Sequence, residues 1–313
     1  MKALINAIKG FKATKKTVRM VALLFILNLF FSAILAVPMY HSLKDSFGDS
    51  LVGERMAKGF DMLWWEEYRD QSEGLERTFT PSVIGKGAIL NNLESLVLMT
   101  FSSLPPAVLV FGLVYIIFRT FLAGGILSTF DRRETQFSLK KFFGGAGIYF
   151  FPFALVMLLS WVFYFGVLDI LNRGFGSIRN SVEQTSFSEV TPFYLGLFFS
   201  VVILFILLLL QMLFDYARIQ IVVEQRKNIL IAVRDALKFL VKHPGSTLAL
   251  FYILMLVNVL VTIVYLLIQN LIPQNSALGV IFVFLIQQIF IFTVIFTRCW
   301  LYASEMNLYK YWR

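Results

Sequence analysis

Long stretches without a charged side chain recur along this chain and decide which surroundings it can fold in. The first runs from Met20 to Tyr40, and the last from Pro244 to Thr297. A helix needs about 20 apolar residues to cross a hydrocarbon layer about 30 Å thick. The last stretch is long enough for two helices, and the turn-forming sequence QNLIPQNSALG divides it. Six transmembrane helices are therefore expected, at residues 20–40, 95–118, 142–168, 190–214, 246–270 and 278–300.

The composition supports this layout and excludes several kinds of site. Apolar residues make up 58% of the chain and charged residues 15%, whereas soluble domains average roughly 45–50% and about 25%. We expect an all-α fold, a six-helix transmembrane bundle that forms one integral membrane domain over residues 1–313. The single cysteine, Cys299, excludes an internal disulfide and a cysteine-based zinc site. His41 and His243 fall at opposite membrane faces, so we expect no metal and no cofactor.

The loops between the spans differ in charge and predict an orientation. Segment 1–19 is amphipathic and carries six Lys and Arg with no acid. With six spans, this segment shares one side with loops 119–141 and 215–243 and with the C-terminus, and together they hold 20 of the 28 Lys and Arg. Loops rich in Lys and Arg remain in the cytoplasm. Both termini are therefore expected there. Nucleic-acid binding is not expected, because the basic residues alternate with spans and form no continuous patch.

Three segments of the chain share one pattern. The sequences INAIKGFKATKK, FSLKKFFGGAGI and RDALKFLVKHPG each combine lysines and apolar residues, end at or contain a small or turn-forming residue, and precede a span. This pattern predicts three pseudo-repeated helical hairpins, each preceded by an amphipathic helix on the cytoplasmic surface.

Every second span ends with an arginine, and these are Arg119, Arg218 and Arg298. Asp215 lies three residues before Arg218, close enough on one helix face for an ion pair. The arginines are interpreted in two ways. They reach lipid phosphates at the membrane surface and fix the orientation. Alternatively, they converge at the cytoplasmic mouth of the bundle, where they bind an anionic headgroup or pair with Asp215 and pin the helices together.

The extracytoplasmic segment 41–94 is too short for a core of its own and is expected to contain an amphipathic helix. Its apolar residues Phe60, Leu63, Trp64 and Tyr68 recur at helical spacing. Trp64 and Trp65 are candidate anchors in the outer headgroup layer. The neighbouring acids Glu66 and Glu67 point about 100° apart on a helix, so they do not form an acid and base pair across a substrate.

The uncharged stretches carry no Asp, Glu, Lys, Arg or His, which disfavours an ion-coupled transport mechanism. Pro105 and Pro106 interrupt the backbone hydrogen bonds of the second span and predict a kink or break there. Such a break marks a binding site in some transporters and is a packing kink in other proteins. No motif of a known catalytic site is present, so an enzyme is not expected.

The stretch DYARIQIVVEQRKNILIAVRDALKFLVKHPG resembles a group of bacterial six-span proteins related to the membrane domain of glycerophosphodiester phosphodiesterases. The matching positions include Asp215, Arg218, Ile219, Val222 and Pro244. The catalytic barrel of the name-giving enzymes is absent. The resemblance therefore implies a bacterial inner-membrane fold and no activity.

Two functions fit these observations. The first is a non-enzymatic membrane component, a scaffold or accessory subunit that binds membrane lipids or other membrane proteins. The alternative is a transporter or flippase for an anionic lipid-like substrate. A hydrated cavity that reaches Pro105 would favour the second.

Overall fold

The computed structural model of the chain describes residues 2–48, 51–52, 55, 60–79, 106–132, 137–185, 190–226, 228–273 and 276–313. Within these residues the fold is all-α and contains no strand. A short 3-10 helix covers Glu76–Thr78. The nine α-helices of the described part are α1 (Lys2–Lys16), α2 (Val18–Phe47), α4 (Met62–Gln71), α6 (Pro106–Asp131), α7 (Leu139–Thr185), α8 (Val190–Glu224), α9 (Ile229–Lys242), α10 (Pro244–Leu271) and α11 (Ala277–Trp312).

Six of these helices are long and apolar enough to span a membrane, namely α2, α6, α7, α8, α10 and α11. At most 33% of the most apolar window of any of them is buried inside the protein. Most of their apolar side chains therefore face outward, where only a hydrocarbon solvent accommodates so large an apolar surface. The chain is a multi-pass membrane protein with six candidate spans, as the uncharged stretches predict.

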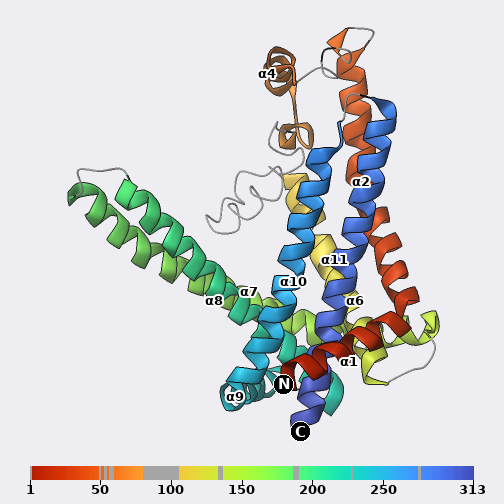
Figure 1. Ribbon diagram of the computed structural model, residues 1–313, viewed down its shortest axis with the longest axis vertical. Helices are drawn as coiled ribbons and strands as arrows, with labels where there is room; N and C mark the ends of the chain where they lie inside the picture. Colours follow the sequence, from red (N-terminus) through yellow and green to blue (C-terminus); the bar gives the residue numbers. More distant parts are fainter. Residues whose placement is uncertain are drawn as a thin grey trace.

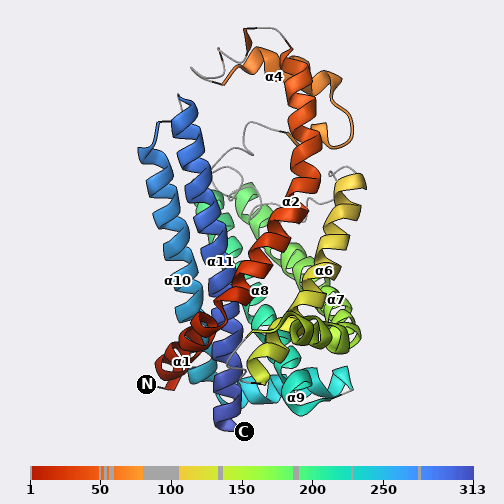
Figure 2. The same ribbon diagram turned by 90° about the vertical axis from the view of Figure 1, so that its right-hand side faces the viewer.

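Both termini lie at one end of the molecule, called the terminal end below, and α4 lies at the opposite, distal end (Figure 1, Figure 2). The packed core lies toward the terminal end, in the C-terminal halves of α8 and α11. Nearly every residue is buried from Met212 to Val222 and from Cys299 to Tyr309. The helices α6, α8 and α11 contact one another. These three spans therefore form the centre of the bundle.

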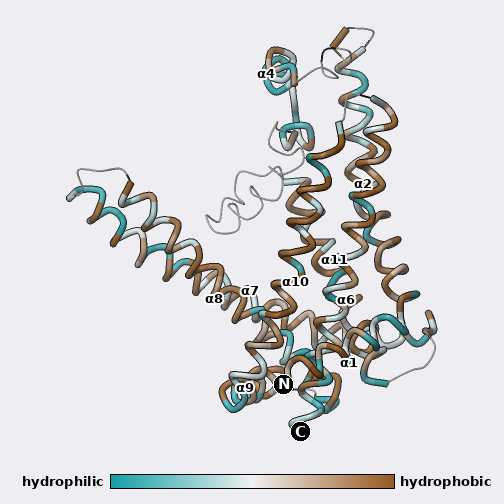
Figure 3. Tube along the Cα trace, in the orientation of Figure 1, coloured by the Kyte–Doolittle hydropathy of each residue, from teal (hydrophilic) through white to brown (hydrophobic). Residues whose placement is uncertain are grey.

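The spans diverge from this core toward the distal end. The pair α7 and α8 runs away from the other spans, whereas α10 and α11 stay side by side (Figure 1, Figure 2). Phe175 of α7 and Phe199 of α8 stack with 4.1 Å between ring centroids. The diverging pair is apolar along most of its length and hydrophilic near its tip (Figure 3). Each side of this pair therefore presents apolar surface suited to lipid contact.

The helix α1 lies across the terminal end and packs directly on α11 (Figure 1, Figure 2). The approach is close because Gly10 has no side chain. A Cβ atom there would lie 2.1 Å from Ser304 Oγ and 2.7 Å from the Ser304 backbone nitrogen. Trp300 Nε1 donates a hydrogen bond of 2.7 Å to the carbonyl oxygen of Ala7. The amphipathic N-terminal segment is thus a fixed part of the fold.

At the distal end, α4 packs against the last turns of α2. Trp64 is buried, stacks on Tyr68 with 5.1 Å between centroids, and donates from Nε1 to Ser46 Oγ at 3.1 Å. Trp65 is half-buried and donates from Nε1 to the carbonyl oxygen of Phe79 at 3.4 Å. The expected amphipathic helix is present. Its Trp64 ring is directed toward α2, whereas Trp65 retains an accessible face.

Five spans, α2, α6, α7, α8 and α11, continue past the ends of their uncharged stretches. The helix α7 continues beyond residue 168 to Thr185, and α8 continues beyond residue 214 to Glu224. A charged residue ends the apolar stretch without ending the helix. Asp169 and Arg173 form an ion pair of 2.9 Å one turn apart, a spacing that supports helical structure.

The helix break expected at Pro105 and Pro106 falls at the edge of the described residues. Residues 80–105 lie outside them, and so does the first part of the expected span 95–118. Pro106 is the first residue of α6.

Candidate functional site

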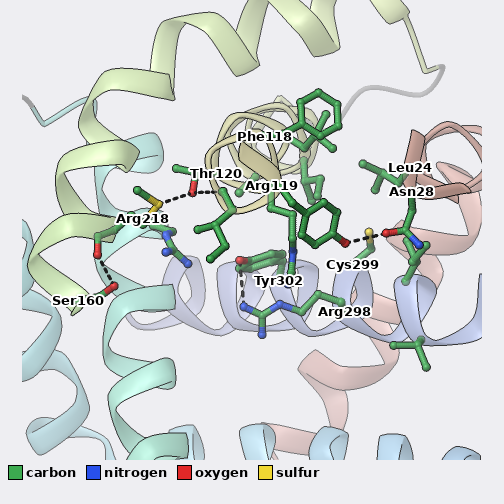
Figure 4. Close-up of a pocket in the computed structure, with 18 of the residues that line it drawn as sticks. Leu24, Asn28, Phe118, Arg119, Thr120, Ser160, Arg218, Arg298, Cys299 and Tyr302 are labelled. Carbon is green, nitrogen blue, oxygen red and sulfur yellow. Dashed lines mark hydrogen bonds between the residues drawn. The ribbon is translucent and has the colours of Figure 1, made fainter. Parts of the chain in front are cut away.

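A cavity of about 780 Å³ lies between α2, α6, α7, α8 and α11 (Figure 4). It is partly open and lies where the spans begin to diverge from the packed core. Its volume falls within the range of about 300–1,000 Å³ that is typical of small-molecule sites. Arg119, Arg218 and Arg298 all line it, although they come from three different helices. The structure therefore brings the three span-end arginines to one space.

Two of these arginines share one buried carboxylate. Asp215 is fully buried. Arg298 Nη2 donates to both of its carboxylate oxygens, at 2.9 Å each, and Arg218 Nη1 donates to Oδ1 at 3.2 Å. Arg298 Nη2 also donates to Tyr302 Oη at 3.0 Å, and its guanidinium lies 4.4 Å from the centre of the Tyr302 ring. Asp215 thus joins α8 to α11 and positions both guanidinium groups.

Arg119 differs from the other two because it forms no ion pair within the described part of the chain. Its guanidinium lies 5.7 Å from the centre of the Tyr115 ring. Tyr115 Oη in turn donates to Asn28 Oδ1 of α2 at 2.7 Å, which holds the ring at the edge of the cavity. The charge of Arg119 is therefore free to face a ligand.

The cavity is basic on balance. Three guanidinium groups line it, and no Asp or Glu does so. Asp215 lies behind two of the arginines, and Glu305 is buried near enough to Asp215 and Arg298 for their charges to interact. Even with both acids ionised, one positive charge remains. Arg218 Nε and Arg298 Nη1 are buried and make no hydrogen bond among the described residues. Two donors of this buried cluster thus have no acceptor among the described residues.

The remaining wall of the cavity is largely apolar and aromatic. Trp161 and Tyr164 of α7 line one side, and Phe118 of α6 and Phe290 of α11 line others. Thr120 Oγ1 donates to Met157 Sδ at 3.2 Å, which joins α6 to α7 beside the arginines (Figure 4). The site therefore combines a cationic cluster with walls that suit hydrocarbon.

A second polar network closes the terminal end. Arg226, in the turn after α8, donates to both Glu224 and Asp235. Tyr309 of α11 donates to Glu224. The hydrogen bond from Arg226, followed by the one from Arg234, keeps the pKa of the half-buried Asp235 carboxyl below its usual value. This network holds α8, α9 and α11 together below the cavity.

The other residues singled out from the sequence lie away from the cavity. Trp64 and Trp65 are on α4 at the distal end, and Pro106 begins α6 without lining the cavity. Pro105 is not among the described residues. No group of three or more His, Cys, Asp or Glu residues suited to a metal occurs in the described ranges.

Sequence reasoning missed the aromatic partners of the arginines. Tyr302 lies four residues after Arg298, which places both on one helix face. This spacing could have predicted their contact from the sequence. Tyr115, four residues before Arg119, has the same relation. The contact between Asp215 and Arg298 joins positions 83 residues apart, and no local pattern indicates it.

Comparison of the chain with protein-family models, with curated proteins and with solved structures gave no match. The resemblance to the phosphodiesterase-associated membrane domain thus stays a prediction. The class that the fold defines is a multi-pass, all-α membrane protein with six candidate spans.

Proposed function

We propose that this protein is a non-enzymatic membrane component that binds an anionic lipid through the arginine-lined cavity. The observation that carries the proposal is the convergence of Arg119, Arg218 and Arg298 on one partly open cavity between spans. Guanidinium groups bind phosphate through paired N–H donors. A phosphate headgroup is therefore the ligand that best matches this cluster.

The rest of the cavity supports a lipid rather than a small soluble anion. Phe118, Trp161 and Phe290 provide apolar surface next to the cations. A soluble anion would leave this surface without a partner, whereas the glycerol and upper acyl carbons of a lipid would cover it. The ligand that satisfies both parts of the wall is amphipathic.

The proposal includes an orientation and a location. The terminal end carries the Lys- and Arg-rich segments, so we place it in the cytoplasm by the distribution of positive charge. The resemblance noted in the sequence would place the protein in a bacterial inner membrane, with three pseudo-repeated hairpins. The helix order supports two of the three copies, since α1 precedes α2 and α9 precedes α10 as short helices before spans. The middle segment instead continues without a break into α7, Leu139–Thr185.

The experiment is a lipid titration of the full-length protein in neutral detergent. Dispersed phosphatidylglycerol is expected to raise the unfolding temperature of the parent, whereas phosphatidylcholine leaves it unchanged. A ligand that binds only the folded state at 100 times its dissociation constant stabilises by about 2.7 kcal/mol. Arg119→Gln is expected to reduce this shift. Because Arg119 pairs with no carboxylate among the described residues, the substitution breaks no ion pair there.

Arg132→Gln is the matched control, because Arg132 is exposed just after the same helix and does not line the cavity. It is expected to keep the full response to phosphatidylglycerol. An equal response of the parent and Arg119→Gln would contradict the proposal, as would a similar loss in Arg132→Gln.

Transport of the same lipid is the alternative function, favoured by the position of the cavity between spans. The two functions differ in vesicles that contain fluorescent phosphatidylglycerol. A lipid-binding component leaves the distribution of this lipid between leaflets unchanged, whereas a flippase or scramblase redistributes it in an Arg119-dependent manner. Redistribution would replace the first proposal with the second.

A further inference from the structure

A second cavity, of about 520 Å³, lies at the terminal end between α1 and the ends of α6 and α11. It is called the lysine groove below. Four lysines line it, and these are Lys9, Lys12, Lys16 and Lys310. No Asp or Glu lines it, and it shares no lining residue with the arginine-lined cavity. The groove is thus a separate basic site, which the proposed function does not use.

The three lysines of α1 face the groove because of their spacing. Lys9, Lys12 and Lys16 are three and four residues apart, which places them on one side of a helix. That side is fixed in space, since Gly10 approaches Ser304 and Trp300 donates to Ala7 on the neighbouring side of α1. The lysines are therefore arranged by packed backbone and do not belong to a mobile tail.

The charge of these three lysines is not neutralised within the fold. Lys310 forms an ion pair of 2.7 Å with Asp131 and also donates to its carbonyl oxygen at 3.1 Å. Lys9, Lys12 and Lys16 form no ion pair in the described part of the chain. Three positive charges in a groove repel one another and are stabilised by an anion between them.

The exposed apolar residues of α1 indicate where the groove lies in the membrane. Leu4, Ile5, Ile8 and Phe11 are between 40% and 56% exposed. Exposed apolar residues beside lysines on one helix are typical of helices that lie in the membrane interface. The helix also crosses the ends of the spans, as an interfacial helix does (Figure 2). The groove therefore opens at the level of lipid headgroups.

We propose that the lysine groove binds the headgroup of an anionic phospholipid with two phosphate groups. From Lys9 to Lys16 the helix rises about 10 Å, which is longer than one phosphate, and basic pockets at this depth suit multiply charged headgroups. This site is independent of the lipid proposed for the arginine-lined cavity. The two sites together would hold lipids at two depths of the same protein.

Native mass spectrometry of the full-length protein tests the proposal with cardiolipin as the diphosphate lipid. The triple variant Lys9→Gln, Lys12→Gln, Lys16→Gln is expected to lose at least about tenfold in affinity for cardiolipin. The matched control is Lys15→Gln, Lys140→Gln, Lys238→Gln, which removes the same charge from exposed positions outside the groove. It is expected to bind cardiolipin as the parent does. Arg119→Gln is also expected to keep this affinity, so failure of one site is distinguishable from failure of the other.

Three results would overturn the proposal. The first is a groove variant that binds cardiolipin with the parent affinity. The second is a control variant that loses as much cardiolipin affinity as the groove variant, which would indicate nonspecific charge attraction. The third is displacement of cardiolipin by inorganic pyrophosphate at equal concentration, which would assign the groove to a soluble diphosphate instead of a lipid. The substituted lysines are exposed, and equal unfolding temperatures of both triple variants and the parent verify that the fold is intact.

Discussion

Asp215 is the residue on which the arginine-lined cavity depends. It accepts three hydrogen bonds from Arg218 and Arg298 while it is fully buried. A buried carboxylate and its cations stabilise a fold only as a set, because loss of one partner leaves the others uncompensated. The same ion pairs hold two guanidinium groups in place for an anionic ligand. Asp215 is therefore expected to support both the stability of the fold and the binding of the ligand.

Asp215→Asn is therefore expected to destabilise the protein by about 3–5 kcal/mol, since two partly buried guanidinium groups lose their fully buried counterion. The measurement is the midpoint of thermal or denaturant unfolding in detergent. Asp169→Asn is the control, because it breaks an exposed pair with Arg173 on α7, which contributes about 0–1 kcal/mol. Equal destabilisation by the two substitutions would refute a structural role for the buried cluster.

His243 gives the protein a predictable response to acid. Its ring stacks on Trp312 with 4.2 Å between centroids, and Lys2 Nζ lies 3.8 Å from the centre of the same Trp312 ring. Partial burial, followed by the charges of Lys242 and Lys2, lowers the pKa of His243 from its ordinary value of 6.5. The unfolded chain then binds this proton more tightly than the folded chain does, so protonation favours unfolding.

Stability is accordingly expected to be lost as the pH falls through about 6.5 toward the lower pKa of the folded state. The lowered pKa of Asp235 acts in a separate window, at and below its ordinary value of 3.8. The measurement is the unfolding temperature at pH 7 and pH 5. The difference between these temperatures should be smaller in His243→Gln, and an unchanged difference would exclude His243 as its source.

At the scale of elements, the close packing of α1 on α11 depends on a missing side chain. Gly10→Val is expected to push α1 away from α11, because even a Cβ atom would lie 2.7 Å from the Ser304 backbone nitrogen. The measurement is the rate of protease cleavage within Lys2–Lys16, which should rise. Gly144→Val serves as the control, since no atom lies within 4 Å of a Cβ there. If both variants were cleaved at the parent rate, α1 would not need this contact.

The elements also show what could be predicted from the sequence. The apolar stretches gave the number of candidate spans and the order of short and long helices, because hydrocarbon thickness sets the length of such stretches. They did not give the full length of α7, whose last turns are held by ion pairs such as Arg179 with Glu183. The convergence of three arginines was one of two open interpretations. Its geometry depends on contacts between distant positions, such as Asp215 with Arg298 and Ala7 with Trp300, which no local pattern contains.

At the scale of the whole molecule, the orientation can be tested because Cys299 is the only cysteine and is buried. Single cysteines at Lys15 and Asp70 in a Cys299→Ala background place one thiol at each end of the bundle. With a membrane-impermeant thiol reagent on intact cells, the cysteine at position 70 should react, and the one at position 15 should react only after lysis. The reverse pattern would invert the proposed topology.

The shape of the whole molecule relates the sites to one another. A tight core near the terminal end holds the spans, which then diverge toward the distal end (Figure 1). The arginine-lined cavity lies where this divergence begins, and the lysine groove lies at the terminal surface. Under the two proposals made above, each of these places would hold an anionic lipid.

Photocrosslinking with phosphatidylglycerol that carries a photoreactive group near its headgroup tests the central claim most directly. The labelled residues of the reconstituted protein are located by mass spectrometry. We predict labelling on the cavity faces of α6 and α11, around Tyr115, Arg119 and Tyr302, with strong reduction in Arg119→Gln and no reduction in Arg132→Gln. Labelling spread evenly over the lipid-facing surfaces, and unaffected by Arg119→Gln, would contradict the account.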